Sequence, residues 1–184
     1  MNQSLPAGDD ARLQFAQLAV QYYVAGRAAS IHQLIPVLGN LLHHAVEMSL
    51  KAALATQLSM PQIRKLGHNL PNLWDSFVGS FRYQAPPHLR PIVEGLQSFE
   101  ELRYPESIMK KGAMMQLALF REHVGDSTPG PANVPTYLLV LEDVDDLMAT
   151  LFNVMNLNPK FFTGALSETG RQHLELHNRF ASQW

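Results

Sequence analysis

The residues of this sequence best suited to chemistry lie within about one helical turn. His43 and His44 stand four and three residues before Glu47, so a helix would gather imidazole and carboxylate groups on one side. Such groups bind zinc at about 2.0–2.2 Å. A zinc site needs a further ligand, which His68 could supply.

A simpler interpretation explains the same residues without a metal. One histidine packs in a helix interface and donates a hydrogen bond, while Glu47 pairs with Lys51 one turn later. This order of charges is the favourable one and contributes ~0.3 kcal/mol when exposed. The spacing also differs from the His-Glu-x-x-His signature of zinc hydrolases. We therefore predict packing and ion pairing here and assign no metal and no cofactor.

A second chemistry, metal-independent cleavage of RNA, requires an arginine near a histidine. Histidine can move the proton of a 2′-hydroxyl group, and arginine can stabilise the charge that develops on the phosphorus centre. Three pairs have a compatible spacing: Arg27 with His32, Arg82 with His88, and Arg171 with His177. A six-residue step turns roughly 240° around an ideal helix, so the last pair shares a face only if the chain bends.

Composition limits the classes of function. With 184 residues and 46% hydrophobic residues, we expect one globular domain spanning 1–184. Only 16% of residues are charged and the formal net charge is −2, so no broad basic field holds nucleic acid non-specifically. Any contact with RNA must be local. The low charge also favours a buried interface, and we expect a homodimer.

The N-terminal residues 1–8 read as a polar tail without the basic and apolar regions of a signal peptide. No apolar run approaches the ~18 residues that a membrane-spanning helix needs. Cysteine is absent, so disulfides and thiolate metal sites are excluded. We expect a cytoplasmic protein that does not enter a membrane.

Hydrophobic periodicity predicts a mainly α protein. In the central segment the apolar positions recur at steps of three and four residues: Leu38, Leu42, Ala45, Ser49, Ala52 and Ala53. Asn69 is placed to cap a helix that has Pro71 in its first turn. The expected helices cover about 10–30, 37–58, 69–81, 91–102, 143–155 and 167–181.

The segment between about 110 and 141 has a different character and reads as an insertion. Two short apolar runs, Ala113–Phe120 and Thr136–Leu141, flank the turn-like segment Gly125–Pro131. This arrangement predicts a β-hairpin. Alternatively, the first run is helical, because alanine, methionine, glutamine and leucine are good helix formers, and the insertion is then irregular.

Three segments, taken in order, resemble the HEPN domains of prokaryotes and eukaryotes. They are His43–Leu54, Gly67–Trp74 and Leu102–Glu106, and the resemblance covers about Asp10 to Glu106. It implies a small up-and-down helical bundle, nucleotide or RNA binding, frequent dimerisation, and ties to toxin–antitoxin or defence systems. Many members are ribonucleases whose arginine and histidine lie on a late helix, which points to Arg171 and His177 here.

The resulting prediction is a HEPN-like regulatory protein that binds a nucleotide or RNA. Its binding surface gathers His43, Glu47, Lys51, His68 and Arg103. Arg103 would hold a phosphate through its bidentate guanidinium, although an arginine at this place can also simply cap a helix end. Two alternatives remain open: a metal-independent ribonuclease that uses Arg171 and His177, and a purely structural dimerisation module.

Overall fold

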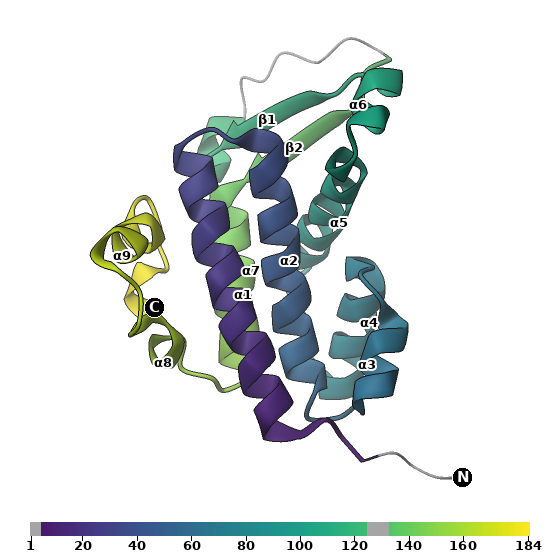
Figure 1. The fold of residues 1–184 in the computed structure, drawn as a ribbon, viewed down its shortest axis with the longest axis vertical. Helices are drawn as coiled ribbons and strands as arrows, with labels where there is room; N and C mark the ends of the chain where they lie inside the picture. The colour runs from purple at the N-terminus through teal and green to yellow at the C-terminus, as the bar shows by residue number, and fades with distance from the viewer. Residues whose placement is uncertain (1–4, 125–132) are drawn as a thin grey trace.

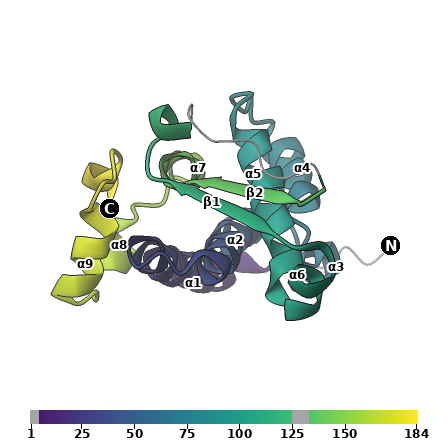
Figure 2. The same cartoon turned by 90° about the horizontal axis from the view of Figure 1, so that it is seen from above.

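The chain forms a mainly helical bundle with two strands laid across one end. A computed structural model describes residues 5–124 and 133–184. Two long helices, α1 and α2, run side by side along the molecule with α7 behind them (Figure 1). The view from above shows β1 and β2 crossing that end of the bundle, with α8 and α9 on one side and α3 to α5 on the other (Figure 2).

The elements have the following bounds. The helices are α1 Gly8–Ile31, α2 Ile35–Leu54, α3 Met60–Leu66, α4 Leu70–Phe81, α5 Leu89–Ser98, α6 Pro105–Lys111, α7 Leu141–Val154, α8 Lys160–Thr163 and α9 Glu168–Glu175. The strands are β1 Met114–Ala118 and β2 Thr136–Val140, and the 3-10 helices are η1 Phe99–Arg103, η2 Arg121–Val124 and η3 Ala181–Gln183. Within the described ranges, none of these helices combines the length and apolarity required to cross a membrane.

Helix α2 is the centre of the bundle. All six positions of its predicted apolar stripe are buried, which confirms the periodicity: Leu38, Leu42, Ala45, Ser49, Ala52 and Ala53. The opposite side of the helix is buried as well, because α2 packs against α1 and α7 and also against α4, α5 and η1. The charged residues Glu47 and Lys51 are therefore buried, whereas the sequence treated them as lying outside the packed stripe.

A glycine on α2 fixes the position of η1. A Cβ atom added to Gly39 would lie 2.0 Å from Cδ1 of Phe99, so only glycine allows this ring to pack against the helix backbone. Phe99 is the first residue of η1 and is completely buried. This contact brings the far end of η1, which carries Arg103, beside the middle of α2.

The predicted β-hairpin is wrong, although both predicted apolar runs contain a strand. Strands β1 and β2 pair in parallel, with Met114 opposite Thr136 and Ala118 opposite Val140. A hairpin is antiparallel, whereas parallel strands need a long connection that returns the chain to its starting end. Here the connection runs from 119 to 135 and begins with η2; the predicted turn Gly125–Pro131 lies outside the described residues.

Several predicted helix ends can be compared with local hydrogen bonds. The side chain of Asn69 accepts a hydrogen bond from Asn72 N at 2.9 Å, which confirms it as the N-cap of α4. Helix α7 begins directly after β2, at Leu141 rather than at Asp143. The tail is shorter than the predicted 1–8, because α1 begins at Gly8. The backbone N–H of Gly8 donates to the backbone oxygen of Ala55, the residue that follows α2.

A buried ion pair joins α1 to α7. The Nη1 atom of Arg27 lies 2.5 Å from each carboxylate oxygen of Asp145, and the two side chains are 0% and 1% exposed. The hydroxyl of Tyr23 donates to Asp145 at 2.6 Å. The sequence indicates only His32 as a possible partner of Arg27. Such a buried charge requires a matched partner and further hydrogen bonds.

The same arginine holds the C-terminal segment against the bundle. Its Nε donates to the backbone oxygen of His173 at 3.0 Å, and Nη2 donates to the oxygen of Leu176. Asn178 completes the contact, donating to Leu174 O at 2.9 Å and to the Tyr23 hydroxyl at 3.2 Å. The end of α9 is thus fastened to α1 through backbone oxygens, a role that side-chain patterns do not reveal.

We predict that Asp145→Asn lowers the free energy of unfolding by about 3–5 kcal/mol, because it leaves the Arg27 charge buried without an anionic partner. Denaturant unfolding followed by circular dichroism measures this change. Asp75→Asn is the matched control, since Asp75 pairs with Arg90 at 2.5 Å but both side chains are about half exposed. An effect of Asp145→Asn no larger than that of the control would contradict the prediction.

Candidate functional site

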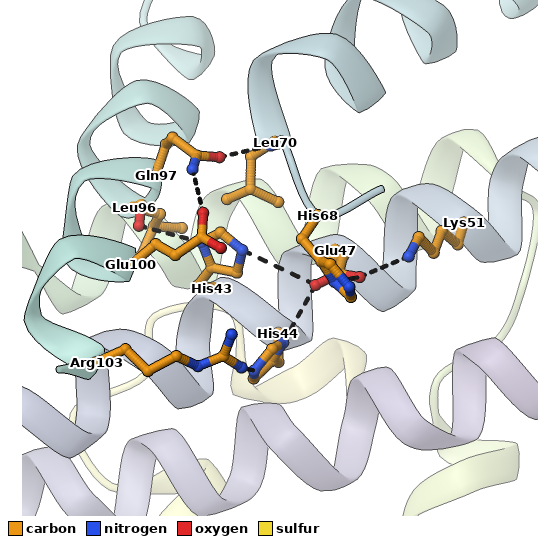
Figure 3. A network of polar contacts seen from close by, with 10 residues as sticks. All are labelled: His43, His44, Glu47, Lys51, His68, Leu70, Leu96, Gln97, Glu100 and Arg103. Atoms are coloured by element: carbon orange, nitrogen blue, oxygen red, sulfur yellow. Dashed lines mark hydrogen bonds and ion pairs between the residues drawn. The ribbon is translucent and has the colours of Figure 1, made fainter. Parts of the chain in front are cut away.

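The buried carboxylate of Glu47 gathers four basic side chains (Figure 3). Glu47 is 0% exposed, and its Oε1 lies 2.6 Å from Lys51 Nζ and 2.8 Å from His68 Nδ1. Its Oε2 lies 3.1 Å from His44 Nδ1 and 3.8 Å from His43 Nε2. Three of these partners come from α2 itself, and His68 comes from the turn between α3 and α4.

These partners determine the charge of Glu47. Burial raises the pKa of its carboxyl group, but the hydrogen bonds from His44 and Lys51 and the positive charge of Lys51 outweigh burial and lower the pKa to about 2. Glu47 is therefore ionised at neutral pH despite complete burial. The predicted Glu47–Lys51 ion pair is present, and it is buried rather than exposed.

Arg103 reaches the cluster through His44. Its Nη2 lies 2.9 Å from His44 Nε2, and a guanidinium can only donate, so this imidazole nitrogen accepts. The proton of neutral His44 must then sit on Nδ1, where it is donated to Glu47. His44 thus connects the exposed guanidinium of Arg103 at the end of η1 to the buried carboxylate of Glu47 on α2.

His68 is an accessible member of the cluster. Its side chain is 63% exposed, and its Nδ1 lies 2.8 Å from the ionised Glu47, to which it donates. The opposite nitrogen, Nε2, is left without a protein partner in the part of the chain that the structure describes. A carboxylate thus fixes the orientation of an exposed imidazole, as second partners do in many functional sites.

His43 has a different environment from the other two histidines. It is buried, and its Nδ1 lies 3.3 Å from the backbone oxygen of Leu96 on α5. Burial lowers the pKa of this imidazole, which is therefore neutral at pH 7. The predicted histidine that packs in a helix interface and donates a hydrogen bond is thus present.

One bridging side chain could not have been found by sequence reasoning. Gln97 Oε1 accepts from Leu70 N at 2.7 Å, and Gln97 Nε2 donates to Glu100 at 2.6 Å (Figure 3). It ties the first turn of α4 to η1 across the site. Glutamine at this place carries no motif, and only the packing of α4 beside α5 gives it this role.

The outer edge of the cluster is polar and accessible. Arg103 is exposed, and Tyr104, which follows it, is 63% exposed. Lys110 and Lys111 at the end of α6 are exposed too, with Lys111 Nζ lying 3.7 Å from Glu101. The five residues predicted for the binding surface come together: His43, Glu47, Lys51, His68 and Arg103. The first three are buried, so only His68 and Arg103 lie at the surface, and their role in binding stays a prediction.

The three candidate arginine–histidine pairs have different surroundings. Arg27 donates to Asp145 and to the backbone oxygens of His173 and Leu176, and no hydrogen bond joins it to His32 among the described residues. Arg82 ends α4 in the left-handed region with φ 48°, while His88 pairs with Asp146 at 2.9 Å. Neither pair forms a joint site.

Arg171, in the middle of α9, and His177, two residues beyond its end, are both exposed. The helix stops at Glu175, and His177 has φ 56°, so the bend that this spacing requires is present. His177 packs edge-on against the ring of Phe120, with centroids 6.0 Å apart. No hydrogen bond or ion pair joins Arg171 to His177 within 5–124 and 133–184, and the catalytic role of the pair stays a prediction.

A comparison of this chain with family models, curated proteins and solved structures finds no match.

The lowered pKa of Glu47 makes stability depend on acid pH. The folded-state pKa of about 2 lies below the ordinary 4.5, so the carboxylate stabilises the fold above pH 4.5, and this contribution is lost as pH falls toward 2. The shift corresponds to about 3 kcal/mol at neutral pH and to roughly half of that at pH 3. We predict that Glu47→Gln removes this part of the pH dependence.

Urea unfolding of wild type and Glu47→Gln at pH 3, 4, 5 and 7 measures the effect. Other titrating groups contribute to both proteins, so the difference between the two curves isolates Glu47. The difference should be largest at pH 7 and shrink steadily toward pH 3. A difference that stays constant over this range would contradict the prediction.

If the exposed pair on and after α9 cleaves RNA, His177→Ala removes the proton acceptor and lowers the cleavage rate at least about 100-fold. Arg171→Ala should lower it by a similar factor through lost charge stabilisation. Electrophoresis of a structured RNA incubated with purified protein and EDTA provides the measurement, with His123→Ala as a surface-histidine control. Cleavage that persists in both variants would eliminate these residues as the catalytic pair.

Proposed function

We propose that this chain is a HEPN-like regulatory protein that binds the phosphate groups of a nucleotide or RNA at the exposed edge of the Glu47 cluster. The observation that carries the proposal is the contact of Arg103 with His44 at 2.9 Å, backed by the buried Glu47. This contact holds an exposed guanidinium against His44, in the same Glu47 cluster as the exposed ring of His68.

The charges of the cluster favour an anion at this edge. Glu47 is buried and already paired with Lys51, so its negative charge is compensated beneath the surface. Arg103 uses one Nη atom for His44 and keeps the rest of its planar fork free of protein partners among the described residues. Guanidinium groups bind phosphate oxygens in pairs, which suits this geometry.

The neighbouring aromatic ring suits a base attached to that phosphate. Tyr104 follows Arg103 directly and exposes 63% of its surface. Stacking of a base on an exposed aromatic ring contributes about 1–3 kcal/mol and tolerates any sequence. A single-stranded RNA or a free nucleotide can therefore use Arg103 for its phosphate and Tyr104 for its base.

The finer parts of the proposal come from the resemblance to HEPN domains. It supports RNA as the ligand, a homodimer as the working form, and a place in a toxin–antitoxin or defence system. The net charge of −2 indicates that binding depends on a few local contacts. The affinity should accordingly fall only moderately with added salt.

We predict that Arg103→Ala weakens binding of a fluorescent single-stranded RNA about tenfold, since a charged hydrogen bond to phosphate contributes about 1.5 kcal/mol. Fluorescence anisotropy measures the dissociation constant, and titration of ATP tests a free nucleotide. Arg171→Ala is the matched control, because it removes an equally exposed arginine from α9 on the other side of the bundle (Figure 1).

Unchanged affinity in Arg103→Ala would contradict the proposed binding edge. Loss of affinity in Arg171→Ala alone would move the nucleic-acid surface to α9. Absence of binding to both RNA and ATP in the wild type would leave the structural dimerisation module as the remaining interpretation.

A further inference from the structure

Two hydrogen-bond acceptors face each other inside the Glu47 cluster. The Nδ1 atom of His43 lies 3.3 Å from Leu96 O, a carbonyl that can only accept, so this nitrogen carries the ring proton. The other nitrogen, Nε2, then presents its lone pair toward Glu47 Oε2 at 3.8 Å. His43 is 3% exposed, and among the described residues no hydrogen bond is donated to its Nε2, whereas Oε2 accepts one from His44.

A third ligand atom points into the same space. His44 Nδ1 lies 3.1 Å from the same Oε2, and one atom from each of His43, His44 and Glu47 falls within 4.8 Å of the others. A tetrahedral ion with bonds of about 2.0–2.2 Å places its ligands about 3.3–3.6 Å apart. The two separations from Oε2, 3.1 and 3.8 Å, bracket that range, and the two histidine ligand atoms lie within 4.8 Å of each other.

We propose that His43 Nε2, His44 Nδ1 and Glu47 Oε2 bind one divalent transition-metal ion, with zinc as the best-fitting probe. Two imidazoles and one carboxylate form a ligand set that zinc accepts, and the fourth position stays open to water. The inference goes beyond the proposed phosphate binding and does not rest on it.

The surroundings of the three ligands already have the form of a metal site. Leu96 O accepts the proton of His43 Nδ1, the kind of outer contact that orients a ligating histidine. Lys51 and His68 both contact Oε1 of Glu47, so among the described residues Oε2 faces only His43 and His44, the two other proposed ligands. The side chains of His44 and His68, 21% and 63% exposed, both lie against Glu47 (Figure 3).

A metal ion and Arg103 require the ring proton of His44 on different nitrogens. A metal on His44 Nδ1 requires the ring proton on Nε2, and this nitrogen then no longer accepts from Arg103. Binding the ion therefore releases Arg103 from α2. As a consequence, Arg103→Ala should bind zinc more tightly than wild type, about three- to tenfold.

Isothermal titration of zinc into the chelator-treated full chain tests the site, and visible absorption of the Co²⁺ form reports the geometry. We expect one zinc per chain, with His43→Gln and His44→Gln each weakening the affinity at least tenfold. His88→Gln is the matched control, since His88 and Asp146 form an exposed histidine–carboxylate pair at 2.9 Å without a third ligand. That variant should bind as the wild type does.

Circular dichroism verifies that each variant is folded. If His43→Gln does not fold, His44→Gln provides the test, because His44 is only half-buried. A water molecule is the competing occupant of the gap. Absence of stoichiometric zinc binding would assign the gap to water and overturn the proposal. Zinc binding that both glutamine variants leave unchanged would overturn it equally, by placing the ion elsewhere.

Discussion

Burial of the Glu47 carboxylate is the constraint on which the candidate site depends. An ionised carboxylate without contact to water is stable only when charges and hydrogen-bond donors surround it. Those partners come from α2 and from the turn before α4, and one of them continues through His44 to η1. The buried carboxylate therefore requires these elements to pack together in a way that brings the basic side chains to it.

The two buried charge clusters of the protein differ in what they leave accessible. Arg27 spends its guanidinium on Asp145 and on two backbone oxygens of the C-terminal segment, so it serves the fold. The Glu47 cluster ends in exposed groups, Arg103 and His68, which retain unused hydrogen-bonding atoms among the described residues. Of these two clusters, only the Glu47 cluster combines a buried, paired carboxylate with an accessible polar edge. The proposed ligand binding depends on this combination.

Features that depend on residues close together in the chain could be predicted from the sequence. The three- and four-residue spacing of apolar residues predicted the buried face of α2, and the cap at Asn69 predicted the start of α4. The five binding candidates were brought together by the HEPN-like order of three segments, and they do gather around Glu47. Local periodicity and motif order were sufficient for this level.

Features set by distant packing could not be predicted. Burial of both sides of α2 depends on α4, α5 and η1, so the sequence alone could not show that the Glu47–Lys51 pair is buried. The parallel pairing of β1 and β2 depends on where the chain re-enters the bundle, which turn composition does not encode. The partners of Arg27 include backbone oxygens, which have no sequence signature.

Nitrogen NMR of the histidine rings tests the central claim most directly, because it reports which ring nitrogen carries the proton. In the metal-free protein at neutral pH, the contacts require His44 to be protonated on Nδ1, with Nε2 accepting from Arg103. His68 should likewise carry its proton on Nδ1, fixed by Glu47. Protonation of both rings on Nε2 would show that Glu47 does not organise the site.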